Sequence, residues 1–263
     1  MSEYKKNLEV QQGYYNSTAD KYDQWHIDPK SAKVVDAWNF ENLKGFLSDK
    51  RIDKCLDLGC GTGRLSHSLL QISKEVYGVD ASREVLKIAR DKYPDLKLGF
   101  AEAVDLPYED DFFDLVVING SLHHFFAMEG TFKEAFRVLN KGGVLAILGE
   151  PNIYYGKWWN PYKYLFILYR VAVMVGNMFR KNKQQSNEPI EPDAEAFVPM
   201  KMKDSLKGVG FDVKKFYTYD FLPRNESKLF LSQYKKILAF DKNVMNKVAM
   251  NLGSAIQCFC VKK

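Results

Sequence analysis

Asp57 and three glycines, Gly59, Gly61 and Gly63, have the residue types and the spacing of a loop that binds a nucleotide-like ligand. The apolar run before them predicts a buried strand, and a helix is expected over Arg64–Ser73. Glycines between a strand and a helix let the backbone approach a ligand closely, and the helix N-terminus adds free N–H donors. The pattern is G-x-G-x-G and lacks the last glycine of the dinucleotide pattern G-x-G-x-x-G, which argues against a nicotinamide dinucleotide.

Asp80 ends a second expected strand, Glu75–Asp80, and stands 17 positions after Gly63. An acid about 20 residues beyond a glycine loop is placed to accept hydrogen bonds from ribose hydroxyls. The alternative is that Asp80 caps the helix expected over Ser82–Tyr93, although Ser82 has the same ability. We favour the ribose-binding role.

Five segments in this order resemble the motifs of the class I S-adenosylmethionine (SAM) methyltransferases, and most of all the methyltransferase type 11 and ubiquinone–menaquinone C-methyltransferase group. The resemblance is close over roughly residues 50–150 and looser over 200–263. The five segments are Cys55–Gly63, Glu75–Asp80, Ala101–Tyr108, Phe113–Phe125 and Glu134–Ile147.

The resemblance implies an α/β fold with a Rossmann-like, doubly wound sheet of seven strands, in which the last strand is antiparallel between the fifth and the sixth. It also implies N-terminal cap helices and a helical insert after strand five. We expect a single domain over 1–263: cap helices (1–50), a SAM-binding core (51–150), a basic aromatic insert or lid (151–198) and the C-terminal part of the sheet (199–263).

The local patterns also predict elements outside the motifs. Ser31–Phe46 is an expected cap helix, and Pro199 is expected to begin a helix that ends at Gly208 and Gly210. After the fifth motif's helix, Gly142 is expected to supply the positive φ of the C-cap. The remaining expected strands are Leu96–Phe100, Phe211–Tyr219 and Ser254–Val261.

The resemblance further implies which residues hold SAM, whose product would be S-adenosylhomocysteine, and no metal is expected. Glu102 stands where the family has an Asp that faces the adenine amino group, and the N–H of Ala103 would meet a ring nitrogen. Tyr14, Tyr15 and Tyr22 resemble aromatic residues on a helix that closes over SAM, or they pack on the core. The expected cofactor-binding residues are Tyr14, Tyr22, Asp57, Gly59, Cys60, Gly61, Gly63, Asp80, Ala81, Glu102, Ala103, Asn119 and Gly120.

His123 and Glu150 are the expected catalytic residues, because each follows a strand whose carboxyl end would border the ligand crevice. A base is needed only if the methyl acceptor must lose a proton. We favour His123 as that base, Glu150 as part of the acceptor pocket, and a packing role for His124, which the family's pattern implies.

The segment between Pro151 and Asn187 carries six basic residues, no acidic residue and nine aromatic residues. Within it, Tyr162–Arg180 is expected to be a helix that is apolar over most of its circumference. Such a helix must be buried, and three partners remain open: a lid on the core, a pocket for a hydrophobic acceptor, or a membrane surface or second copy contacted through 154–183. Arg170 in its middle argues against a membrane-spanning helix.

Composition agrees with one α/β core, since 46% of the 263 residues are hydrophobic. The four cysteines form no metal pattern, and Met1–Lys6 leads into no apolar stretch, so we expect a cytoplasmic protein that is peripheral to the membrane at most. The basic residues are concentrated in the apolar and aromatic segment between Pro151 and Asn187. No Pro-Cys motif for cytosine methylation and no Asn/Asp-Pro-Pro-aromatic motif for amine methylation follows strand four. A nucleic-acid substrate is therefore disfavoured.

Together these features predict a SAM-dependent methyltransferase that acts on a small, hydrophobic or lipid-linked acceptor. Two alternatives remain open. One is a membrane-surface or scaffold protein that binds SAM without turnover, and the other is a dehydrogenase that binds NAD.

Overall fold

The computed structural model describes residues 3–24, 29–155, 157–161, 164, 167–168, 196–222, 228–249 and 251–263. Its strands are β1 Ile52–Leu58, β2 Ser73–Asp80, β3 Lys97–Phe100, β4 Phe113–Asn119, β5 Leu139–Pro151, β6 Phe211–Tyr219 and β7 Ala255–Lys262. Its α-helices are α1 Glu3–Thr18, α2 Lys30–Leu47, α3 Arg64–Leu69, α4 Arg83–Lys92, α5 Met128–Val138, α7 Pro199–Val209, α8 Lys228–Phe240 and α9 Asn246–Val248.

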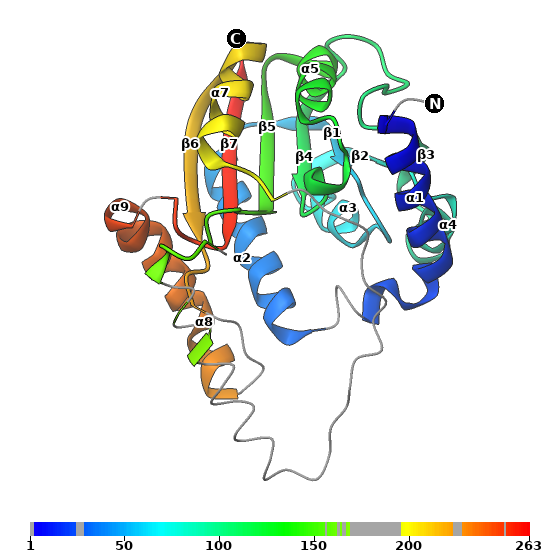
Figure 1. The fold of residues 1–263 in the computed structure, drawn as a ribbon. Helices are drawn as coiled ribbons and strands as arrows, with labels where there is room; N and C mark the ends of the chain where they lie inside the picture. Colours follow the sequence, from blue (N-terminus) through cyan, green and yellow to red (C-terminus); the bar gives the residue numbers. More distant parts are fainter. Residues whose placement is uncertain are drawn as a thin grey trace, which may run out of the picture.

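The described strands form one sheet in the order β3-β2-β1-β4-β5-β7-β6 (Figure 1). Pairing is parallel from β3 to β5, and β7 is antiparallel to both of its neighbours. This arrangement confirms the expected doubly wound sheet and the insertion of an antiparallel last strand between strands five and six. The division of the chain into four parts stays a prediction.

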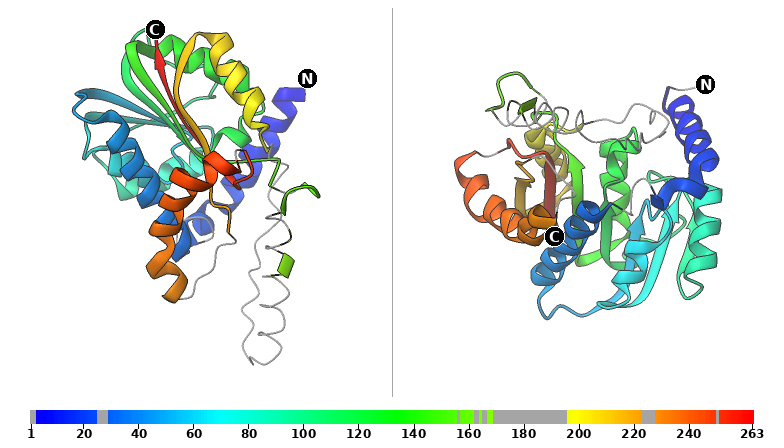
Figure 2. Two further views of the ribbon diagram at one scale, coloured as in Figure 1. Left: turned by 90° about the vertical axis from the view of Figure 1, so that its left-hand side faces the viewer. Right: turned by 90° about the horizontal axis from the view of Figure 1, so that it is seen from below.

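Two apolar layers fill the space on either side of the sheet, with α5 and α7 covering one face and α2 and α8 the other (Figure 2). The central strands are apolar on both sides, as strands covered by helices on both faces must be: Leu115–Ile118 of β4 is fully buried. Aromatic side chains of α2 and α8, Trp38 and Tyr234, enter the second layer. The core thus holds rigidly the strand ends that carry the polar residues discussed below.

Several helix ends follow the predicted chemistry. Pro199 begins α7, where its missing N–H costs no hydrogen bond, and Gly210 ends that helix with a φ of 116°. Ser82 caps α4, because its Oγ accepts a hydrogen bond from the backbone N–H of Val85 at 3.3 Å.

Two expectations were wrong in detail, and one helix was not expected. The helix expected over Arg64–Ser73 ends at Leu69, because Ser73 already pairs with Ile52 as the start of β2. Gly142 does not cap a helix: α5 ends at Val138, whose carbonyl accepts the N–H of Phe112, and the φ of 75° at Gly142 lies inside β5. No local pattern had predicted α8.

The helix expected over Tyr162–Arg180 lies outside the described residues, except for positions 164, 167 and 168. The same holds for most of the 154–183 segment. Among the helices that the structure describes, none combines the length and the apolar character needed to cross a bilayer.

Gly253, between α9 and β7, should tolerate no side chain. A Cβ there would lie 2.5 Å from the carbonyl oxygen and 2.6 Å from the nitrogen of Tyr219, at the end of β6. Gly253→Ala is therefore expected to lower the free energy of unfolding by about 1–3 kcal/mol in urea denaturation. Gly208→Ala, whose Cβ would meet nothing within 4 Å on the exposed side of α7, is the control and should raise it by about 0.5–1 kcal/mol. Equal effects would contradict the expectation.

Candidate functional site

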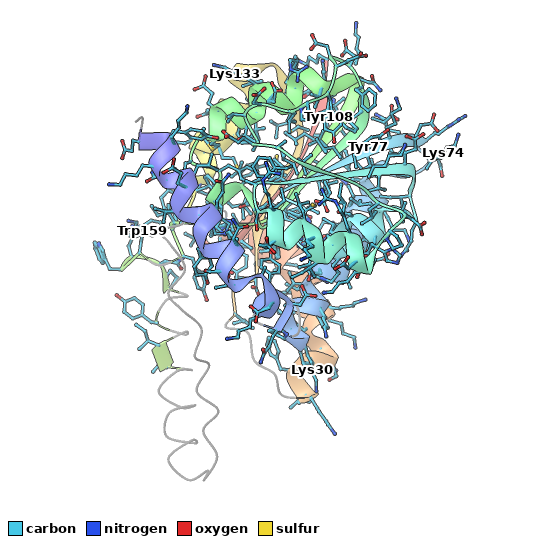
Figure 3. All side chains as sticks on the ribbon, turned by 90° about the vertical axis from the view of Figure 1, so that its right-hand side faces the viewer. Lys30, Lys74, Tyr77, Tyr108, Lys133 and Trp159 are labelled. Atoms are coloured by element: carbon cyan, nitrogen blue, oxygen red, sulfur yellow. The ribbon has the colours of Figure 1, made fainter. Side chains whose placement is uncertain are left out.

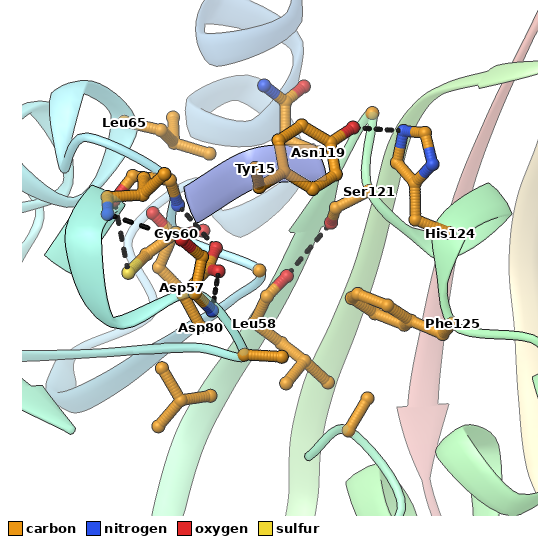
Figure 4. A pocket seen from close by; sticks show the side chains of 18 of the residues that line it. Tyr15, Asp57, Leu58, Cys60, Leu65, Asp80, Asn119, Ser121, His124 and Phe125 are labelled. Atoms are coloured by element: carbon orange, nitrogen blue, oxygen red, sulfur yellow. Dashed lines mark hydrogen bonds between the residues drawn. The ribbon is translucent and has the colours of Figure 1, made fainter. Parts of the chain in front are cut away.

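A cavity of about 380 Å³ opens at the carboxyl ends of the parallel strands. The glycine loop after β1, the ends of β2 and β4, and the helices α1 and α2 all contribute to its wall (Figure 4). This is the edge at which doubly wound sheets bind their ligands.

The glycine loop is shaped by close contacts that leave no room for side chains. Gly59 has a φ of 77°, and a Cβ there would lie 2.7 Å from Cβ and Oγ of Ser121. Gly61 has a φ of 53°, and a Cβ there would come within 3.2 Å of the Tyr22 hydroxyl. Glycine is required at both positions, because other residues rarely adopt positive φ and would also clash. The loop therefore exposes bare backbone to the cavity.

Asp57 and Asp80 place two carboxyl groups beneath this loop. Oδ2 of Asp57 accepts a hydrogen bond from the Ser66 hydroxyl at 2.6 Å. Burial, together with the neighbouring charge of Asp80, raises the pKa of Asp57 to about 7. Burial also raises the pKa of Asp80. A cationic group in the cavity would favour the ionised form of both.

The Asp80 carboxylate organises the loop and leaves the helix cap to its neighbour. It accepts the backbone N–H groups of Gly61 and Ser82, each at 2.9 Å. Since the Ser82 hydroxyl caps α4, the alternative role of Asp80 as that cap is not needed. Asp80 lines the cavity, and each carboxylate oxygen retains a further lone pair for a ligand.

Glu102 and Ala103 line the cavity beyond β3. Oε2 of Glu102 accepts a hydrogen bond from the Tyr4 hydroxyl of α1 at 3.1 Å. Burial and the nearby Glu102 charge raise the pKa of Tyr4 well above its usual value, so its hydroxyl stays a donor. This contact fastens the first turn of α1 over the cavity.

His123 and Glu150 form a hydrogen-bonded pair at the end of β4. Nδ1 of His123 lies 2.8 Å from Oε2 of Glu150, whose side chain is fully buried. The same carboxylate accepts the backbone N–H groups of Ser121, Leu122 and His123 at 3.0–3.2 Å. These bonds satisfy the buried charge and fix the imidazole, so Nε2 is the nitrogen left to act as a base. Glu150 itself lies behind the cavity wall.

The aromatic cluster of the N-terminal segment meets the turn after β4. The Tyr15 hydroxyl lies 2.9 Å from Nε2 of His124 (Figure 4), and its ring centre is 6.0 Å from that of Tyr22. Tyr15, Tyr22 and His124 line the cavity. Tyr14 does not: it packs edge-on against Tyr15, with ring centres 5.2 Å apart.

Gln11 of α1 carries a buried amide that finds no partner among the described residues. It lines the cavity, is 4% exposed, and neither Oε1 nor Nε2 has a hydrogen-bond partner among the described residues. An unsatisfied buried amide costs about 1–3 kcal/mol. Such a group is expected where a bound ligand supplies the missing bonds.

Most of the predicted site residues are brought together by the fold. Within the described residues, no group of three His, Cys, Asp or Glu side chains is placed to hold a metal ion. Three predicted residues lie outside the cavity lining: Tyr14, Glu150, and Gly63, which begins α3 with a φ of 82°. Those that line the cavity are Tyr22, Asp57, Gly59, Cys60, Gly61, Asp80, Ala81, Glu102, Ala103, Asn119, Gly120 and His123.

Tyr4 and Gln11 were missed by the motif comparison, because they precede its first motif. A helical pattern was the available signal: Tyr4, Leu8, Gln11 and Tyr15 recur at spacings of four, three and four, which places them on one face of α1. All four line the cavity.

Residues 56–147 match the family model of the methyltransferase domain. The demethylmenaquinone methyltransferase of Chlorobaculum parvum is 35% identical over 184 residues, 65% of this chain and 71% of the relative. That of Staphylococcus aureus is 29% identical over 70% of this chain and 78% of the relative.

Solved structures show the same fold at low identity. A SAM-dependent methyltransferase from Thermotoga maritima, named as a possible histamine N-methyltransferase, aligns with a TM-score of 0.60 at 19% identity, covering 95% of this chain and 99% of the other. The complex of the Haloferax volcanii Trm112 methyltransferase activator with a methyltransferase gives 0.59 at 16% identity, with 93% and 96% covered.

The raised pKa of Asp57 predicts a pH-dependent stability. The native state holds this proton up to about pH 7, whereas the unfolded chain releases it near 3.8, so the free energy of unfolding should fall as pH rises between these values. The contribution of Asp57 to this fall is at most about 4 kcal/mol. Asp57→Asn keeps the acceptor for Ser66 and should have a flatter profile in urea denaturation at several pH values. Parallel profiles for both proteins would contradict this assignment.

Proposed function

Because the chain belongs to the SAM-dependent methyltransferases, as its 35% identity over 71% of a curated relative shows, we propose that it transfers the methyl group of SAM to a small, hydrophobic or lipid-linked acceptor. The observation that carries this proposal is that His123, held 2.8 Å from the buried Glu150 carboxylate, lines the same cavity as the glycine loop. A side chain able to act as a base would therefore share one volume with the loop that would hold the cofactor.

The residues present fit SAM. The loop of bare backbone at Gly59 and Gly61 can approach the amino-acid tail, and Asp57 and Asp80 supply negative charge for a cationic ligand. Asp80 would accept the ribose hydroxyls, Glu102 and Ala103 would meet the adenine, and Asn119 would border the tail. Gln11 offers the N–H donors of its Nε2 and the acceptor Oε1, which find no partner among the described residues.

Relatives favour a quinone-like ring as the acceptor. The curated relatives at 35% and 29% identity are named for methylation of demethylmenaquinone, a small lipid-linked molecule. The cavity wall mixes apolar residues such as Leu8, Val35, Leu65 and Phe125 with polar ones, which suits a hydrophobic ring that bears hydroxyl groups.

SAM supplies a methyl group already activated on a sulfonium sulfur. The side chains have to align the acceptor atom with the methyl carbon and exclude water. His123 would accept at Nε2 the proton of an acceptor hydroxyl, and the resulting imidazolium would be stabilised by the buried Glu150 carboxylate. SAM, held by the glycine loop, Asp80 and Glu102, would then supply the methyl carbon for the new bond to the acceptor atom, and its C–S bond would break to give S-adenosylhomocysteine.

The cysteines and the proposed reaction bear on the compartment and on the partners of the protein. All four cysteines are buried free thiols, which supports a reducing compartment such as the cytoplasm. The partner is a small-molecule acceptor rather than a nucleic acid.

His123→Ala tests the chemistry. The assay follows S-adenosylhomocysteine formation from SAM with reduced demethylmenaquinone, or with extracted membrane lipids, as acceptor. Loss of a general base is expected to lower kcat about 100-fold or more, and the Kd for S-adenosylhomocysteine should stay within about twofold. Glu150→Gln should lower kcat in the same direction, because it removes the charge that stabilises the imidazolium.

The matched control is His67→Ala, since His67 stacks on Tyr93 outside the cavity lining. Wild-type kcat in His123→Ala would refute the base. Cofactor binding without transfer to any acceptor, by wild-type protein, would instead favour the alternative of a protein that binds SAM without turnover.

Gln11→Leu should change stability and cofactor binding in opposite directions. Without its ligand, the variant no longer buries an unsatisfied amide, so its free energy of unfolding should rise by about 1–3 kcal/mol. The Kd for S-adenosylhomocysteine should rise about tenfold as the ligand loses its bonds to the amide. Gln71→Leu, at an exposed position after α3, is the control. Unchanged affinity in Gln11→Leu would exclude the amide from the cofactor site.

A further inference from the structure

Four apolar side chains lie exposed on the outer side of the helical segment formed by α8, the π-turn Asp241–Met245 and α9. Leu229 and Val248 are 78% and 80% exposed, and Phe240 and Val244 lie between them with about half of their surface accessible. They stand 11, 4 and 4 positions apart, which is close to whole helical turns. The inner side of the same segment, with Tyr234 and Leu238, is fully buried against the sheet layer.

Further exposed apolar residues stand on the adjoining segment after β5. Trp158 is 74% and Leu168 is 65% exposed, and Trp159 is exposed too (Figure 3). The Asn160 amide donates hydrogen bonds to the carbonyls of Tyr154 and Leu252, so this segment is fastened to the turn that follows α9. Figures 1 and 2 show the described part of 157–168 on the same side of the molecule as α8 and α9.

We call these exposed apolar residues and the lysines among them the basic apolar surface. Its apolar residues are Trp158, Trp159, Leu168, Leu229, Phe240, Val244 and Val248. Those lysines are Lys157, Lys228, Lys235, Lys236 and Lys247, all exposed. In the described parts of 157–168 and 228–249 the acidic residue is Asp241, which is buried and accepts the backbone N–H groups of Asp220 and Phe221. The surface is therefore cationic without a compensating exposed carboxylate in those parts.

The position of this surface relates it to the cavity. β5 and β6 both end at the carboxyl edge of the sheet, where the cavity opens, and the two segments that carry the surface follow those strand ends. A β6–β7 antiparallel pair needs only a short turn, yet residues 220–254 separate these strands. The added chain places apolar and basic side chains at the edge where ligands enter.

We propose that the basic apolar surface docks the enzyme on an anionic lipid bilayer. Lysines interleaved with tryptophan and aliphatic side chains suit the interface of an anionic bilayer. At that depth the ammonium groups can contact lipid phosphates while the apolar side chains enter the hydrocarbon below them. Lysines near such a membrane are attracted by its negative potential. A second copy of the chain is a poorer partner, because a twofold contact would bring the same lysines together.

Docking goes beyond the proposed methyl transfer and does not need it. It would hold the cavity next to the phase in which a hydrophobic acceptor dissolves. The surface residues lie outside the cavity lining, so binding to vesicles and binding of S-adenosylhomocysteine are separate measurements.

Vesicle co-sedimentation of the full-length protein, without SAM and without acceptor, tests the proposal. Vesicles of phosphatidylcholine alone are compared with vesicles of equal parts phosphatidylcholine and phosphatidylglycerol, at low and at high salt. Binding is expected on the anionic vesicles, with a partition coefficient that falls as salt increases.

Two double variants separate the apolar and the charged contributions. Lys235→Ser with Lys236→Ser should weaken binding about 25-fold, and Leu229→Ser with Val248→Ser at least tenfold. The matched control is Lys74→Ser with Lys133→Ser, which removes the same charge from the opposite end of the molecule (Figure 3) and should weaken binding far less. All variants should keep the wild-type Kd for S-adenosylhomocysteine, which shows that they are folded.

Three results would overturn the proposal. The first is that the protein does not bind anionic vesicles at low salt. The second is that the Lys235/Lys236 variant and the control lose equal amounts of vesicle binding, and the third is that the wild-type protein is a dimer without vesicles and that Leu229→Ser with Val248→Ser dissociates it. The first two would remove the membrane as the partner, and the third would assign the surface to a second copy of the chain.

Discussion

The buried carboxylate of Glu150 is the constraint on which the site depends. Fully buried and unpaired, such a charge would be strongly destabilising. It is held by the backbone N–H groups of Ser121, Leu122 and His123 and by the His123 ring. Because all of these groups donate to one carboxylate, they hold the chain after β4 in a single turn. In that turn the Ser121 hydroxyl donates a hydrogen bond to the Leu58 carbonyl at 3.0 Å. Ser121 in turn fills the space that a side chain on Gly59 would need. One carboxylate at the end of β5 thus couples the position of the His123 ring to the shape of the glycine loop.

The helix α1 closes the cavity through contacts at both of its ends. Tyr4 bonds to Glu102, on the side where the adenine is expected, and Tyr15 bonds to His124, beside the proposed base. Between them, the Gln11 amide finds no partner among the described residues. The helix is therefore fastened by residues from both halves of the cavity, and the Gln11 amide lines the same cavity. A ligand that extends from one half to the other would be placed to bond to this amide.

Local patterns predicted the parts of the molecule whose cause is local. The strand boundaries at Phe211–Tyr219 and the cap chemistry of α4 and α7 follow from residues within a few positions of one another. Strand order came from the family resemblance, since pairing between distant segments leaves no local trace. α8 was missed because apolar residues stand on both of its sides: Tyr234 and Leu238 are buried, whereas Leu229 and Phe240 are exposed. The burial of Gln11 was not predicted for a related reason, because burial of a polar residue on a mostly polar helix depends on what the helix covers. Likewise, the position of Glu150 at the carboxyl end of a strand predicted that it borders the crevice, but the sequence carried no sign that its side chain would bond to His123.

The sheet topology explains why the site and the basic apolar surface share one edge. Parallel strands release the chain at their carboxyl ends, so any segment inserted after β5 or β6 emerges beside the cavity. The antiparallel β7 reinforces this effect, because it starts at the same edge and lets the segment after β6 return without crossing the sheet. Insertions at these two points can therefore alter how an acceptor reaches the cavity without disturbing the core that holds Asp80 and Glu150. The exposed side of α8 and α9 is free to change in this way, whereas the inner side is bound by packing on α2 and the sheet. That division between a constrained inner side and an unconstrained outer one would let a methyltransferase core carry different outer surfaces on the same sheet, among them the bilayer-binding surface that we propose.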